Sequence, residues 1–256
     1  MRLYDAYLLD LDGTVYRGEE PCQGAAEAID WLLERGSKIR YLTNNSTVLP
    51  QEVAERLEGM AIPCDPNWVI TSAQATAALC KGKGHSSVAV LGETALLTQL
   101  ESAGIDTFPV TSDASATAVV AGLCRSLDYD LLSNAMNRIL AGAEFVATNS
   151  DIRFPLPGGT LKPGAGAIIA ALEACTSRIP LVAGKPEPLM AQMAMESAGT
   201  VPQSTLIVGD SMATDIACGQ AAGCDTYLVL SGVTSSLPKG QSGGENLMEL
   251  RKQTTV

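Results

Sequence analysis

The chain has 256 residues, a formal net charge of −11 and one histidine. That length is enough for one or two domains with a sizeable apolar core. The acidic balance argues against nucleic-acid binding, which needs basic patches, and the longest apolar runs are too short to span a bilayer. Asp5 interrupts the first residues, so we find no signal-peptide pattern and expect a cytoplasmic protein that binds no membrane.

Cysteine and histidine usage narrows the chemistry further. The seven cysteines are scattered and never form Cys-x-x-Cys, which is typical of reduced, mostly buried thiols and argues against a zinc site. His85 lies in a polar run at 81–87, where we expect a surface residue in a linker. One histidine placed there also argues against Ser-His-Asp or Cys-His catalysis.

The first predicted strand, at residues 6–9, ends in two carboxylates, Asp10 and Asp12, and then Gly13. Ligands in open α/β sheets bind at the carboxyl ends of the strands. With a divalent cation, one carboxylate there could attack phosphorus and the other could act as acid and base. An Asp-x-Asp pair alone also fits a plain strand end and turn, so the rest of the chain must decide.

Helical spacing over 25–33 is followed by a predicted strand at 39–42, which ends in Thr43, Asn44 and Asn45. These polar side chains suit a phosphate group, but they suit turns and helix caps equally well. A helix at 50–57, a strand at 68–70 and a helix at 72–79 complete a pattern that predicts a parallel sheet with right-handed crossovers.

After the run at 81–87 a second α/β pattern begins, with predicted strands and helices up to a helix at 164–175. The loop at 149–159 is too long to be a plain connection, and such loops often carry function. We interpret 82–179 as an inserted second domain.

The first pattern then resumes with a predicted strand at 181–183, directly before Lys185. A lysine held there could bind phosphate, or it could be solvated in a turn. Another strand, at 205–208, precedes Asp210 and Asp215. Turn formation and the helix dipole are the alternative explanations for these two residues.

Four polar clusters therefore follow separate strands in a set order. They read Asp-Leu-Asp-Gly-Thr-Val, Thr-Asn-Asn-Ser, Gly-Lys-Pro-Glu-Pro and Gly-Asp-Ser-Met-Ala-Thr-Asp-Ile. Together they resemble the four motifs of the haloacid dehalogenase-like hydrolase superfamily, in its NagD-like and 4-nitrophenylphosphatase-like subfamily, over about residues 4–234. The resemblance implies an α/β fold: a Rossmann-like, doubly wound parallel sheet core (1–81 and 180–256) with an inserted α/β cap domain (82–179).

The resemblance also implies roles for these residues. Asp10 would be the nucleophile and Asp12 the general acid and base. Mg²⁺ would be held by the Asp10 carboxylate, the Asp12 backbone carbonyl and Asp210. The remaining implied roles are phosphate binding by Thr43 and Lys185, with help from Asn44 and Asn45, and support of the metal or of Lys185 by Asp215.

The cap loop resembles the substrate-selecting loop of the subfamily, because Thr148-Asn149-x-Asp151 matches its pattern. We expect Arg153, Phe154 and Leu156 to face the substrate, with Arg153 reading a second anionic group. A salt-bridged surface arginine and a core phenylalanine are the alternatives.

We therefore expect a Mg²⁺-dependent phosphatase that acts on small phosphomonoesters through an aspartyl-phosphate. Phosphoryl transfer between two positions of a sugar, and a phosphoacceptor or binding module without turnover, are the alternatives. The sequence leaves open the natural substrate, the pathway and whether the chain is a monomer or a homodimer. It also leaves open whether the tail after Val233 adds a strand to the core sheet, beyond the one short helix expected there.

Overall fold

The structure is a computed structural model that describes residues 3–155 and 160–253. These residues divide into two compact units, each built on a parallel sheet. The first unit comprises the described residues of 1–43, 50–70 and 185–256, and the second comprises those of 44–49 and 71–184. The assignment of 82–179 to a cap domain stays a prediction.

The sheet of the first unit has β1 (Ala6–Asp10) near its middle, between β13 (Thr205–Gly209) and β4 (Lys38–Thr43). β1 runs parallel to both neighbours. The apolar residues of β1 and β13 are buried, because helices cover both faces of such a sheet. The full strand order is β15-β14-β13-β1-β4-β5, where the outer strands are β5 (Val69–Thr71), β14 (Asp225–Val229) and β15 (Gly243–Gly244).

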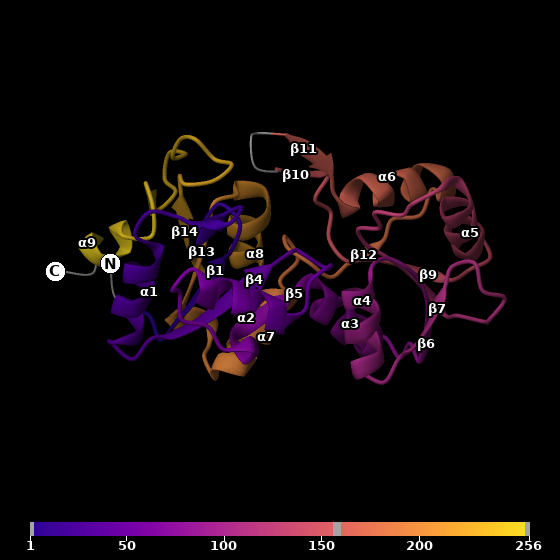
Figure 1. Ribbon diagram of the computed structural model, residues 1–256, viewed down its shortest axis with the longest axis horizontal. Helices are drawn as coiled ribbons and strands as arrows, with labels where there is room; N and C mark the ends of the chain where they lie inside the picture. The colour runs from indigo at the N-terminus through magenta and orange to yellow at the C-terminus, as the bar shows by residue number, and fades with distance from the viewer. Residues whose placement is uncertain (1–2, 156–159, 254–256) are drawn as a thin grey trace. The chain divides into compact units, whose positions relative to one another are not determined.

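Helices and short helical turns connect these strands (Figure 1). α1 (Ala25–Leu33) buries Ala28, Ile29 and Leu32, as the helical spacing predicts. The other elements are α2 (Pro50–Gly59), η1 (Pro66–Trp68), α7 (Leu189–Ala198), η3 (Pro202–Ser204), η4 (Met212–Ile216), α8 (Ala217–Ala221) and α9 (Glu249–Gln253).

The C-terminal tail does add to this sheet. β15 pairs with β14 in parallel, with Leu228 opposite Gly243. α9 is the short helix expected there, and it packs beside α1 although the two are far apart in the chain (Figure 1). The tail therefore contributes a two-residue edge strand, which answers the question that the sequence left open.

The second unit has a five-stranded sheet in the order β12-β9-β8-β6-β7. The strands are β6 (Ser87–Leu91), β7 (Asp106–Pro109), β8 (Ala118–Ala121), β9 (Glu144–Ala147) and β12 (Leu181–Val182). The helices are α3 (Ser72–Gly82), α4 (Thr94–Ser102), α5 (Tyr129–Leu140) and α6 (Ala165–Thr176). All the paired strands of this sheet are parallel.

Both faces of this second sheet are covered. Val88 and Val90 of β6 belong to an apolar cluster with residues of α3 and α4. Ala89 and Leu91, which point to the opposite face, belong to a cluster with residues of α5 and α6. The α/β fold class with parallel sheets, predicted from the sequence, is thereby confirmed.

Several local predictions differ from the structure. We expected the strand at 181–183 in the first sheet, but β12 pairs with β9 in the second. A two-residue strand has too little sequence pattern to reveal its partner. The sequence also missed β7 and two antiparallel hairpins: β2 (Tyr16–Arg17) with β3 (Glu20–Pro21), and β10 (Arg153–Pro155) with β11 (Leu161–Pro163).

The prediction that His85 is a surface residue is wrong. Its side chain is only 10% exposed, and its ring nitrogens contact Thr117 Oγ1 at 2.9 Å and Glu144 Oε2 at 2.7 Å. α3 extends to Gly82, so the predicted linker is partly helical, and the His85 N–H bonds to the Cys80 carbonyl at the helix end. Among the described residues, the helices are too short or too polar to cross a membrane.

Candidate active site

Lys185 lies at the centre of a buried charged cluster in the first unit. Its Nζ donates to Asp10 Oδ1 at 2.5 Å and to Asp215 Oδ1 at 2.6 Å. A third, longer bond of 3.4 Å reaches the Leu42 carbonyl near the end of β4. Lys185 is 2% exposed, so its charge is satisfied by these partners and not by bulk water.

Backbone N–H groups orient the Asp210 and Asp215 carboxylates. Asp210 Oδ2 accepts the Val233 N–H at 2.6 Å, and Asp215 Oδ2 accepts the Ser211 N–H at 3.1 Å. Gly232 passes so close to Asp210 that a β-carbon there would overlap the carboxylate. A close approach of this kind requires glycine, and it confines the Asp210 side chain to one position.

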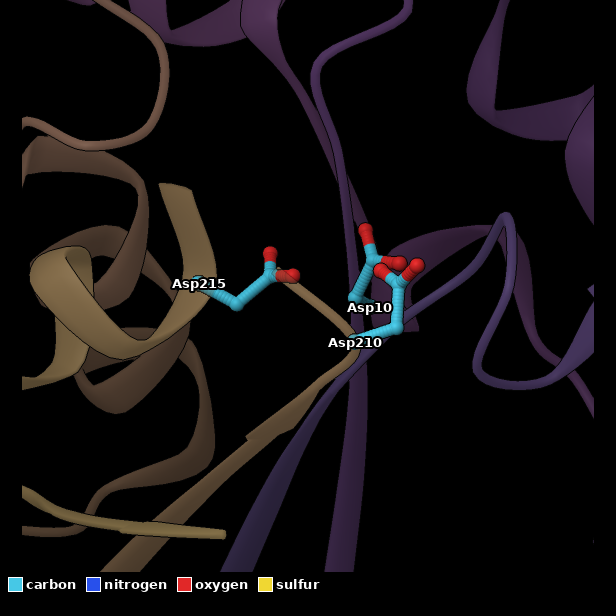
Figure 2. A group of neighbouring side chains, drawn as sticks. All are labelled: Asp10, Asp210 and Asp215. Carbon is cyan, nitrogen blue, oxygen red and sulfur yellow. The ribbon is translucent and has the colours of Figure 1, made fainter. Parts of the chain in front are cut away.

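Asp10, Asp210 and Asp215 each turn a carboxylate toward a common space (Figure 2). One oxygen from each lies within 4.8 Å of the others. Three carboxylates face one ammonium, which is bonded to two of them, so ionised carboxylates would leave two negative charges in excess. Hard carboxylate oxygens and a deficit of two positive charges fit a divalent cation such as Mg²⁺.

The pKa values of Asp10, Asp210 and Lys185 are shifted in the directions that burial and an excess of negative charge produce. Burial, followed by the Asp215 charge, raises the pKa of Asp10 well above its usual range, although Lys185 opposes the effect. Burial and Asp215 also raise the pKa of Asp210 to about 6, against the Val233 N–H bond. Burial lowers the pKa of Lys185, but Asp10 and Asp215 outweigh it and raise that pKa, so the lysine is charged.

Asp12 follows β1 in a tight turn that Gly13 makes with a φ of +88°. Asp12 is exposed, unlike Asp10, yet desolvation by the surrounding protein raises the pKa of its carboxyl. Arg56, Lys185 and a hydrogen bond with Tyr16 oppose that rise in the pKa. A carboxyl whose pKa is raised holds a proton more readily, as an acid catalyst must.

Thr43 ends β4, the strand beside β1. Asp10 is in register with Leu42, so Thr43 lies one residue beyond it at the same edge of the sheet. Thr43 is buried. The first unit thus brings together five residues from the four predicted clusters, with Asp12 beside them: Asp10, Thr43, Lys185, Asp210 and Asp215.

Asn44 and Asn45 belong to the second unit, where both side chains are hydrogen-bonded. Asn44 Nδ2 donates to Asp151 Oδ2 at 3.0 Å. Asn45 Oδ1 accepts both the backbone N–H and the hydroxyl of Thr47, each at 2.8 Å. In the structure these two side chains therefore anchor local loops, and their predicted help in phosphate binding stays a prediction.

The cap loop carries the other predicted residues. Asp151 also donates its backbone N–H to Asn149 Oδ1 at 3.1 Å, and Asn149 Nδ2 donates to the Asn44 carbonyl at 2.8 Å. On β10, Arg153 is exposed and Phe154 is half-buried. Leu156, also predicted to face the substrate, lies outside the described residues.

Sequence reasoning missed Tyr16 and Arg56, which the structure places around Asp12. The Arg56 guanidinium lies 4.5 Å from the centre of the Tyr16 ring. The Tyr16 side chain is hydrogen-bonded to the Asp12 carboxyl. An aromatic residue in a turn and an arginine on a distant helix share no spacing signal, so composition and periodicity could not have paired them.

The sequence of this chain is similar to those of known hydrolases. One family model, described as haloacid dehalogenase-like hydrolase, matches residues 7–106, and a second, for HAD-like hydrolases, matches 182–244. The chain is 40% identical to the 5'-nucleotidase YutF of Bacillus subtilis over 91% of this chain and 90% of that protein.

Two solved structures are similar over nearly the whole chain. NagD from Escherichia coli superposes with a TM-score of 0.87 at 30% identity, covering 97% of this chain and 98% of NagD. A glycerol phosphate phosphatase from Mycobacterium tuberculosis, solved in complex with magnesium, gives a TM-score of 0.88 at 33% identity, covering 96% of this chain and 77% of that one. With two matching family models and a relative that is 40% identical over 91% of this chain, the chain belongs to the haloacid dehalogenase-like hydrolases.

Proposed function

We propose that this chain is a Mg²⁺-dependent phosphatase that hydrolyses small phosphomonoesters through an aspartyl-phosphate on Asp10. The observation that carries the proposal is the bonding of Lys185 between Asp10 and Asp215 beside a third carboxylate, Asp210. Such a cluster holds a fixed positive charge and an excess of negative charge at the end of a strand, where α/β folds bind ligands. The solved relative in complex with magnesium supports the choice of ion.

The Asp10 and Asp210 carboxylates and the Asp12 backbone carbonyl would hold the metal ion. When bound, Mg²⁺ supplies positive charge that offsets the repulsion between the carboxylates and an anionic phosphoryl group. Asp215 is already bonded to Lys185 and to the Ser211 N–H, so it would hold the lysine in place. Thr43 and Lys185 would bind the phosphoryl oxygens.

In the first half of the reaction, an Asp10 carboxylate oxygen attacks phosphorus and forms an O–P bond. The bond from phosphorus to the ester oxygen breaks, and its electron pair stays on that oxygen. Asp12 gives its proton to the departing oxygen, so the product is a neutral alcohol. Lys185 stabilises the negative charge of the phosphoryl oxygens as they transfer.

In the second half, a water oxygen attacks phosphorus and displaces the Asp10 carboxylate. Asp12, now ionised, takes a proton from that water, which restores both carboxyl groups to their starting states. The raised pKa of Asp12 supports this exchange, because it brings the proton affinity of the group closer to neutral pH. Free phosphate and the alcohol are the two products.

Arg153 and Phe154 are the residues that we propose for substrate selection. An exposed guanidinium can bind a second anionic group, and a half-buried ring can pack on a small carbon skeleton. The relatives named above as a 5'-nucleotidase and a glycerol phosphate phosphatase support a small phosphomonoester as the substrate class.

The test is phosphate release from 4-nitrophenyl phosphate and from a panel of sugar phosphates, glycerol phosphate, phosphoglycolate and nucleoside monophosphates. We expect release with Mg²⁺, none with EDTA, and a loss of at least about 10³-fold in Asp10→Asn. Release that persists in Asp10→Asn would exclude the aspartyl-phosphate. Isomerised sugar phosphate in place of free phosphate would show a transferase, and a long-lived labelled protein would show a phosphoacceptor module.

A further inference from the structure

Tyr16 is held against the turn that carries Asp12. The Gly13 N–H donates to the Tyr16 carbonyl at 2.7 Å, and the Tyr16 N–H donates to the Leu11 carbonyl at 3.1 Å. Asp12 and Tyr16 also form an isolated β-bridge. These backbone bonds close the turn on both sides of Asp12, so the position of the tyrosine is set by the same short segment as the carboxylate.

The Tyr16 side chain is 4% exposed, and it is hydrogen-bonded to the Asp12 carboxyl. A phenol that is this well buried stays protonated at neutral pH, so its O–H donates and a carboxyl oxygen accepts. This contact, together with the backbone bonds of the turn, limits the orientation of the Asp12 carboxyl.

Arg56 of α2 holds this tyrosine and the hairpin that begins with it. Its guanidinium lies 4.5 Å from the Tyr16 ring centre, in the arrangement of a cation–π contact. Its Nη2 also donates to the Gly18 carbonyl, in the turn between β2 and β3. One arginine therefore fixes both the ring and the hairpin, and its charge lies close enough to attract the Asp12 carboxylate.

We propose that Tyr16 and Arg56 are positioning residues for Asp12, which orient its carboxyl toward the leaving oxygen of the substrate. The inference rests on the phosphatase function proposed above. A general acid must lie within hydrogen-bond reach of the oxygen that it protonates, and a small misplacement is costly. Asp12 is exposed, so contacts with Tyr16 and Arg56 limit a rotation that solvent would allow.

The experiment compares two substrates that differ in their need for an acid. Glycerol phosphate releases an alkoxide, which must be protonated, whereas 4-nitrophenyl phosphate releases a stable phenolate, which need not be. The quantity to measure is kcat/KM with Mg²⁺. It reports the steps up to release of the alcohol and excludes the later hydrolysis of the aspartyl-phosphate on Asp10.

Tyr16→Phe removes the hydroxyl and keeps the ring beneath Arg56. Since general acid catalysis contributes on the order of 10²- to 10⁴-fold, we expect the loss of orientation to lower kcat/KM for glycerol phosphate by about tenfold. For 4-nitrophenyl phosphate we expect a change of less than about threefold. Arg56→Lys keeps the charge but loses the planar contact and its fixed geometry. It should also lower the ratio of kcat/KM for glycerol phosphate to kcat/KM for 4-nitrophenyl phosphate.

Tyr4→Phe is the matched control, because the Tyr4 hydroxyl donates to a carboxylate, Asp225 Oδ2, at 2.7 Å. That pair lies at the amino end of β14, whereas Asp10 lies at the carboxyl end of β1, so the two are at opposite ends of the sheet's parallel strands. We expect Tyr4→Phe to leave the ratio between the two substrates unchanged.

Equal losses for both esters in Tyr16→Phe and Arg56→Lys, or unchanged rates for both, would overturn the positioning role. Arg56→Lys carries the test alone if Tyr16→Phe does not fold by circular dichroism. Failure of the phosphatase function itself looks different, because the wild-type protein would then release phosphate from neither ester.

Discussion

Two polar clusters of this protein differ in whether their charges balance. In the first unit, the ammonium of Lys185 is bonded to Asp10 and Asp215, and Asp210 lies beside them, so three carboxylates face one positive charge. In the second unit, the buried Asn149 amide donates to the Asn44 carbonyl at 2.8 Å and to Thr148 Oγ1 at 3.2 Å. In these two bonds a neutral donor meets a neutral acceptor.

The difference separates a cluster of structural hydrogen bonds from one whose charge suits a bound cation. A balanced network of hydrogen bonds stabilises the fold without any addition. A buried excess of like charge costs folding free energy until a cation or a proton relieves it. The first unit can tolerate that cost because β1, β4 and β13 form the buried middle of its sheet. Four predictions test this contrast, beginning with the largest expected effect and ending with the smallest.

Lys185→Ala should produce the largest effect. Removal of one partner from a buried ion pair costs about 3–5 kcal/mol, because the remaining charges are left uncompensated. We expect the free energy of unfolding at pH 7 to fall by about 3 kcal/mol, measured by urea denaturation, and turnover to disappear. Part of the lost stability should return at pH 5, where the carboxyls bind protons. A variant as stable as wild type at pH 7 would mean that the cluster is not under electrostatic stress.

Asp210→Asn should change stability in the opposite direction in the protein treated with EDTA. The folded pKa of Asp210, about 6, lies above its ordinary value of 3.8, so the folded state binds the proton more tightly than the unfolded state. The contribution of this group to stability is therefore lost as the pH rises from about 4 through 6. We expect the variant to exceed wild type by about 1–2 kcal/mol at pH 7 and to match it near pH 4.

Added Mg²⁺ should reverse that ranking. Binding stabilises the folded state by about 2.7 kcal/mol when the free ion is at 100 times its Kd. We expect Mg²⁺ to raise the Tm of wild type and to leave the Tm of Asp210→Asn nearly unchanged. An equal rise in both proteins would place the ion elsewhere.

Asn149→Ala should have the smallest of these effects. The change leaves the Asn44 carbonyl and Thr148 with fewer partners, and we expect the free energy of unfolding to fall by about 1 kcal/mol. The loss should be the same at pH 5 and pH 8 and with or without Mg²⁺, because neither the Asn149 amide nor its two acceptors carry a charge. A loss that depends on the metal would show that the two clusters are coupled.

The order of the polar residues after predicted strands, together with the family resemblance, predicted most of the charged cluster. Asp10, Lys185 and Asp210 each follow a predicted strand. Asp215 lies shortly after the same strand as Asp210. Parallel strands of one sheet end at one edge, so such residues can meet although 175 positions separate Asp10 from Lys185. The strand that we predicted at 181–183 pairs with β9 in the sheet of the second unit, yet Lys185 is bonded to Asp10 in the first unit. The family resemblance therefore predicted the position of Lys185 better than the assigned strand did.

The sequence by itself determined the α/β class, the buried strands and the order of the polar clusters, because these depend on local periodicity and on short motifs. Only the tertiary structure decided that β12 joins β9, that the His85 ring bonds to Thr117 and Glu144, and that Arg56 covers Tyr16. Each of these contacts joins segments distant in the chain through a single side chain or a two-residue strand. Such contacts depend on how whole elements pack, and they leave no periodic pattern in the residues that make them.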